Sequence, residues 1–172
     1  MSDQLEQIEG VDFAVAMYRE DGAWVVRELA HDLLTDVETL THALHRFPGD
    51  GGAIAMAAID EDFFVIVRVF GAATKVLLSD VTAADEWELA ASALDVLGLP
   101  LPEEVEDEDE EEPDPAGDLG ILADFGMSAV EMGMLLDDMF EDDLYPDETL
   151  SEIARAIGCG EAFDDAVGLM PA

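Results

Sequence analysis

The side chains best suited to metal or acid–base chemistry in this sequence lie in one short segment. Glu38, His42 and His45 are spaced at i, i+4 and i+7, which would place them along one helix face within reach of a metal ion. The acidic turn Asp60–Asp62 could add carboxylates. A small metal-dependent enzyme is therefore one hypothesis. Because a Glu–His pair four residues apart is also an ordinary surface interaction, we expect no bound metal or other cofactor.

Motifs for other reactions are absent. A zinc deaminase of nucleobases needs H-x-E and P-C-x-x-C, but each of the three histidines is followed two residues later by an apolar side chain, and the chain has one cysteine. The phosphate-binding G-x-x-x-x-G-K-[ST] loop and the serine nucleophile elbow are also missing. Acidic neighbours raise the pKa of a thiol, so Cys159 is predicted to be a buried or incidental thiol. We assign no catalytic residue and expect a protein that is not an enzyme.

The strongest signal in the sequence is its charge. Among 172 residues, 43 are Asp or Glu and six are Lys or Arg, for a net charge of −37. Residues 76–172 alone hold 29 acids and one base, Arg155, and ten of the twelve residues from Glu103 to Asp114 are acidic. Such a polyanion repels nucleic-acid phosphates and anionic membranes, so neither is an expected partner.

A basic protein is the partner that this charge favours, because opposite charges steer association. The candidate partner-binding residues are the carboxylates of the two densest acidic segments: Glu103, Glu104, Glu106, Asp107, Glu108, Asp109, Asp137, Asp138, Asp142 and Asp143. Two simpler explanations stay open. The acidic run could be a solvated linker that keeps the protein soluble, or the acidity could reflect a saline habitat.

The hydrophobic pattern predicts the elements that must position these residues. Strands are expected at residues 11–19, 24–29, 52–59, 63–70 and 75–80. A helix capped by Thr35 should follow the second strand, and a helix capped by Thr82 should bury Trp87, Ala91, Leu94 and Leu97. The order ββαβββα predicts an α+β fold, with a five-stranded antiparallel sheet and two helices. It is similar in order to longin and profilin-like modules.

The rest of the chain is expected to be a linker and a helical region. Residues 99–117 form an acidic, proline-containing linker between a sheet domain at 1–98 and a small helical domain at 118–172. In that last region we predict a short turn of helix at Asp118–Phe125, a helix capped by Ser128 and one that begins near Pro146. Methionines at 127–139 suit either a core or an adaptable partner groove, so a self-associating scaffold is a third hypothesis. Oligomeric state is not predicted.

The start of the sequence lacks the basic and apolar segments of a secretory signal, and no apolar stretch reaches 18 residues. The expected location is therefore cytoplasmic.

Several segments resemble a known family. They are Phe13–Gly22, Asp60–Val69, Leu78–Trp87, Pro115–Leu119 and Leu144–Glu148. Together they are similar to the bacterial tRNA adenosine deaminase-associated proteins, over nearly the whole chain. The resemblance implies an accessory protein of the tRNA-editing deaminase, and it carries no catalytic or binding residue over to this sequence. It agrees with the charge, because a tRNA deaminase must present cations to its substrate. The leading hypothesis is a non-enzymatic partner that modulates or chaperones the deaminase.

Overall fold

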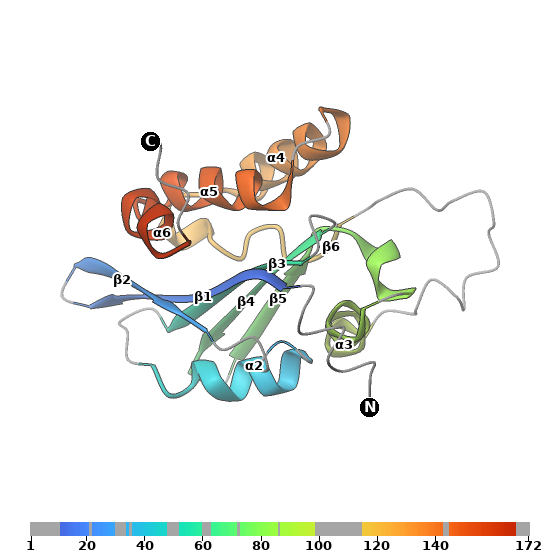
Figure 1. Ribbon diagram of the computed structural model, residues 1–172, viewed down its shortest axis with the longest axis horizontal. Coiled ribbons are helices and arrows are strands. Elements are labelled where there is room, and N and C mark those ends of the chain that lie inside the picture. The colour runs from blue at the N-terminus through green and yellow to red at the C-terminus, as the bar shows by residue number, and fades with distance from the viewer. Residues whose placement is uncertain are drawn as a thin grey trace.

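A six-stranded antiparallel sheet separates two layers of helices in the computed structural model (Figure 1). The structure describes residues 11–20, 22–29, 34, 36–47, 52–59, 63–71, 73–85, 87–98, 115–142 and 145–167. The strand order is β2-β1-β3-β4-β5-β6. The strands are β1 (Val11–Glu20), β2 (Ala23–Glu28), β3 (Ala53–Ile59), β4 (Phe63–Phe70), β5 (Ala73–Leu78) and β6 (Ala116–Gly117). The predicted α+β class and its antiparallel sheet are therefore confirmed.

The helices divide between the two faces of the sheet. Helices α2 (Val37–Leu44) and α3 (Glu88–Leu97) cover one face, and α4 (Ala129–Glu141), α5 (Pro146–Ala156) and α6 (Gly160–Val167) cover the other (Figure 1). Strand β3 shows the division, because Ala55 and Ala57 share a core with α2 and α3, whereas Ile54 and Met56 share a core with the C-terminal helices. Every residue of β3 is buried for this reason.

The sixth strand was not predicted. Strand β6 has two residues, which pair with Leu77 and Leu78 of β5. A strand this short has no apolar alternation to detect. Gly117 has a φ of +112°, a backbone conformation that favours glycine, and a Cβ at this position would meet the carbonyl oxygen of Val76.

Two helix starts differ from their predictions. Asp36 is the N-cap of α2, because its Oδ1 accepts a hydrogen bond from the Thr39 amide at 2.7 Å, and Thr35 lies outside the described residues. A 3₁₀ turn at Val81–Asp85 precedes α3, whose N-cap is Trp87. Trp87 is extended there and its ring lies 6.2 Å from that of Phe63.

The predicted buried face of α3 is confirmed in part. Trp87 and Leu94 are buried, whereas Ala91 and Leu97 are only partly buried. Leu89, Ala90 and Ala93, which were not predicted, complete the buried face.

The predicted turn of helix at residues 118–125 occurs only at the end of that segment, as the 3₁₀ turn η4 (Ala123–Phe125), and a non-helical turn precedes it. Asp118 Oδ1 accepts a hydrogen bond from the Gly120 amide at 2.9 Å, which gives this backbone an alternative to helical hydrogen bonding. The two other predicted helix starts in this region are confirmed. Ser128 caps α4, and Pro146 lies in the first turn of α5.

Within the part of the chain that the structure describes, no helix combines the length and the apolar character needed to cross a bilayer.

Candidate partner-binding surface

Helix α4 is held on the sheet by one apolar side. Ser128 Oγ accepts a hydrogen bond from the Glu131 amide at 3.2 Å and so starts the helix. Met132, Leu136 and Met139 follow at spacings of four and three, and all three are buried in the core that α4 shares with the sheet. This packing directs the opposite side of α4 away from the protein.

That opposite side combines apolar and acidic side chains. Val130 and Met134 are exposed by 73% and 61% and lie four residues apart, one turn of the helix. The same helix carries exposed carboxylates, with Glu131 beside Val130 and the others toward the C-terminal end: Asp137, Asp138, Glu141 and Asp142. We call these seven residues the α4 face. Neither Lys nor Arg occurs between Ala129 and Asp142, so the carboxylates have no basic neighbour on their own helix.

The carboxylates of the α4 face repel one another and interact unfavourably with the negative end of the helix dipole. Asp137 and Glu141, and likewise Asp138 and Asp142, are like-charged pairs four residues apart, which destabilise a helix. All four lie toward the C-terminus of α4, the negative end of its dipole, and no basic residue lies in the last turn. A basic partner would relieve both effects.

The predicted partner-binding residues are only partly within the described chain. Asp137, Asp138 and Asp142 are exposed together on the α4 face. Asp143 and Glu103, Glu104, Glu106, Asp107, Glu108 and Asp109 lie outside the described residues, and their role stays a prediction. Sequence reasoning missed Val130 and Met134. The available signal was their spacing, because Met134 lies two residues from the buried Met132 and therefore falls on the opposite side of a helix.

The residues of the metal hypothesis are not gathered in the described structure. Glu38, His42 and His45 are exposed on or just after α2, and Asp60–Asp62 lies outside the described residues. Among the described residues, no group of three His, Cys, Asp or Glu side chains could hold a metal ion.

Cys159 is buried, which is one of the two predicted outcomes, but the cause of its raised pKa differs from the one expected. Its Sγ lies 3.7 Å from Sδ of Met17 in the core between the sheet and the C-terminal helices. Burial raises the pKa of the Cys159 thiol to about 12, so removal from water, and not repulsion by neighbouring acids, is the cause.

Comparison with known proteins decides the family. Residues 12–160 match the family model described as Rv3753c-like tRNA adenosine deaminase-associated protein. The chain belongs to this family. It is 39% identical over 157 residues to Protein Rv3753c of Mycobacterium tuberculosis (strain ATCC 25618 / H37Rv), in an alignment that covers 90% of this chain and 87% of that relative. No solved structure matches the chain.

The family match confirms the resemblance drawn from the sequence. It includes helices of both layers, ends at the start of α6 and contains the whole α4 face. The family description names association with a tRNA adenosine deaminase, which is the description of an accessory protein.

Proposed function

We propose that this protein is a non-enzymatic partner of a tRNA adenosine deaminase, and that it binds a basic surface of that enzyme through the α4 face. The observation that carries the proposal is the combination of exposed apolar and acidic residues on α4, because apolar contact supplies affinity while charge selects and steers the partner. The family description supports the identity of the partner. The proposed location is the cytoplasm.

A deaminase that acts on tRNA needs a basic surface, and such a surface is complementary to this acidic protein. Such an enzyme needs Lys and Arg side chains to neutralise the phosphates of its substrate. A protein with a net charge of −37 can therefore occupy the surface that tRNA would otherwise contact. The acidic segment at Glu103–Asp109 is proposed to add to this attraction. Binding by this protein would modulate the deaminase or keep it folded until tRNA arrives.

The test is a binding measurement with the purified deaminase at 0.1 M and 1 M salt. Asp137→Asn, Asp138→Asn and Asp142→Asn are combined in one variant. We expect it to bind between about threefold and about a hundredfold more weakly at 0.1 M salt, since each exposed ion pair contributes about 0.2–1 kcal/mol. Met134→Ala should weaken binding at both salt concentrations. Affinity that is unchanged between 0.1 M and 1 M salt would contradict the electrostatic part of the proposal.

The matched control changes the same number of charges elsewhere. Glu148→Gln, Glu152→Gln and Glu161→Gln replace three exposed carboxylates on α5 and α6. This variant should retain most of the affinity. Equal losses in the two variants would show that total charge, and not the α4 face, determines binding. Addition of tRNA then separates two roles, because competition indicates a shared surface and a ternary complex indicates a docking role.

A further inference from the structure

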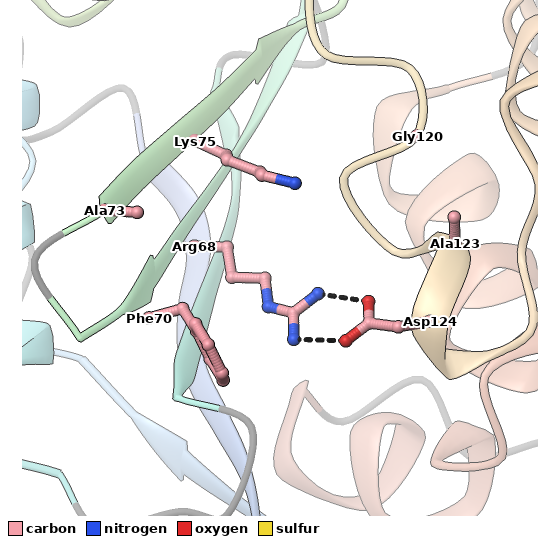
Figure 2. A pocket seen from close by; sticks show the side chains of 7 residues that line it. All are labelled: Arg68, Phe70, Ala73, Lys75, Gly120, Ala123 and Asp124. Atoms are coloured by element: carbon pink, nitrogen blue, oxygen red, sulfur yellow. Dashed lines mark hydrogen bonds and ion pairs between the residues drawn. The ribbon is translucent and has the colours of Figure 1, made fainter.

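A pocket of about 300 Å³ lies between strands β4 and β5 and the loop that precedes α4. Arg68 and Phe70 of β4 and Lys75 of β5 line its sheet side, and Asp124 of η4 lies across from them (Figure 2). Gly120 and Ala123 complete the loop side. In Figure 2 the side chains of Arg68 and Lys75 extend from the strands toward this loop.

The pocket has an unusual charge for this protein. Among the described residues, its lining holds two cations and one carboxylate, although the whole chain has six cations and 43 acids. The guanidinium of Arg68 is occupied, because it binds both carboxylate oxygens of Asp124 and donates to the Ile121 carbonyl oxygen at 3.0 Å. Lys75 is the cation that can bind a further group.

The ammonium of Lys75 can exchange its present carboxylate partner for that of a ligand. It is the only lysine of the sequence and its side chain is 52% exposed. Its Nζ lies 3.4 Å from Oδ2 of Asp118, whose side chain is also partly exposed. An ion pair with this exposure contributes between zero and about 1 kcal/mol. A carboxylate in the pocket can therefore take over the ammonium at little cost.

Phe70 provides a second, apolar contact. Its side chain is 57% exposed, and the guanidinium carbon of Arg68 lies 5.8 Å from the centre of its ring. Arg68 also lies 4.4 Å from the ring centre of Phe125, so the cation is held between two aromatic rings. A ligand ring placed on Phe70 would cover apolar surface that is now in water.

We propose that this pocket binds a small aromatic carboxylate, with its ring on Phe70 and its carboxylate at Lys75. Asp124 already neutralises Arg68, so Lys75, whose ammonium is held by one exposed ion pair, is the group that favours an anion over a cation. The nearby carboxylates of Asp118 and Asp124, together with the charge of the whole chain, favour a monoanion over a phosphate with two charges. The pocket loop leads directly into α4, so an occupied pocket would hold that segment more firmly on the sheet.

The single lysine gives a direct test in the full-length protein. Reductive methylation with ¹³C-formaldehyde keeps the charge of Lys75 and adds one NMR signal, separate from that of the terminal amine. Phenylacetate is the probe. We expect a saturable shift of the Lys75 signal with phenylacetate, and a much smaller one with acetate, which lacks the ring, or with phenethylamine, which has the opposite charge. Equal shifts with acetate and phenylacetate would overturn the proposal, as would the absence of saturation.

Two variants test the contacts separately. Phe70→Leu should weaken phenylacetate binding about three- to tenfold, the effect of one aromatic contact. Lys75→Gln should abolish the rise in melting temperature that phenylacetate produces. Arg27→Gln removes one exposed cation from β2, at the other edge of the sheet, and should leave both measurements unchanged. A Phe70→Leu variant that binds phenylacetate as tightly as the parent protein contradicts the site.

Discussion

Arg68 and Asp124 form a two-point ion pair that joins the centre of the sheet to the loop before α4. Arg68 is 5% exposed on β4, whereas Asp124 is 60% exposed on η4. One guanidinium nitrogen lies 2.7 Å from Oδ2 of Asp124, and the other binds Oδ1 (Figure 2). A buried guanidinium requires this partner, because an uncompensated charge in the core is costly. The pair therefore fixes where the helical layer begins.

Asp124→Asn should lower the free energy of unfolding by about 1–3 kcal/mol at pH 7, because it removes the negative charge beside a buried cation. The hydrogen bonds from Arg68 hold the pKa of Asp124 below its ordinary value of 3.8. A lowered carboxyl pKa contributes stability above the ordinary pKa, and that contribution is lost as the pH falls through the lowered value. The difference in stability between the parent protein and the variant should therefore shrink below about pH 4.

Denaturant unfolding from pH 2 to pH 7 measures this difference. Asp118→Asn is the control, because it keeps the oxygen that accepts from Gly120 and loses only an exposed ion pair. It should cost less than about 1 kcal/mol. A difference for Asp124→Asn that does not change with pH would contradict the assigned ion pair.

The fold was largely predictable from apolar spacing. Strands β3 and β4 were placed within one residue, because their long apolar runs are bounded by turns. The same runs held a further signal, since apolar residues at both parities, as in Ile54 and Ala55, indicate that both faces of an antiparallel strand are covered. That signal points to a helical layer on the second face. The start of α3 was misplaced because Trp87 packs in an extended conformation that no local pattern indicates.

The candidate sites were less predictable because they depend on long-range contacts. Charge density along the chain located Asp137, Asp138 and Asp142, but not the exposed Val130 and Met134 beside them. The pocket joins residues of β4 and β5 to a loop about 50 positions later. The one local sign was Arg68, a cation inside an apolar strand, which needs a partner from elsewhere in the chain.

The two tryptophans test the predicted division into a sheet domain and a helical domain. Trp24 Nε1 donates to the Ile157 carbonyl oxygen at 3.2 Å, so this ring reports on the C-terminal helices. Trp87 belongs to the core on the other face. Because both cores share the same strands, we expect a single unfolding transition. During denaturant unfolding of Trp24→Phe, the fluorescence should change at the same denaturant concentration as the far-UV circular dichroism, and the same should hold for Trp87→Phe. Separate transitions would support two independent domains.

Gly117→Ala should destabilise the protein and disrupt the pairing of β6. A Cβ at Gly117 meets the backbone carbonyl of Val76, which cannot move without breaking the sheet. Gly22→Ala is the control, since it has a similarly positive φ of +81° and no atom near its Cβ. The control should cost about 1 kcal/mol from backbone strain alone, and Gly117→Ala clearly more. Equal melting temperatures for the two variants would show that β6 does not contribute to stability.

Cys159 should resist thiol reagents in the folded protein. At pH 8 we expect almost no reaction with Ellman's reagent until guanidinium unfolds the chain, because burial raises the pKa of this thiol to about 12. An acid whose pKa is raised on folding contributes stability below its unfolded pKa and loses that contribution as the pH rises. The parent protein should therefore lose stability between about pH 9 and pH 12 relative to Cys159→Ala. Rapid modification of the native protein would contradict the buried position.

The acids of the α4 face should reduce stability while they serve binding. Asp138→Asn and Asp142→Asn together remove a like-charged pair and two charges from the negative end of the helix dipole. This double variant should be more stable by about 0.5–1.5 kcal/mol at low salt, and the gain should shrink at 1 M salt. Denaturant unfolding at the two salt concentrations measures it.

Glu148→Gln separates this local effect from the charge of the whole chain. Glu148 lies in the first turn of α5, at the positive end of that helix dipole, so its replacement should lower stability by a few tenths to about 1 kcal/mol at low salt. Each of these substitutions reduces the net negative charge, by one unit at each position. If Glu148→Gln also raised stability, general repulsion within the polyanion would explain both results. A gain in stability for the double variant together with a loss for Glu148→Gln would show that the acids at the end of α4 weaken the fold locally. Their retention would then agree with a role in binding.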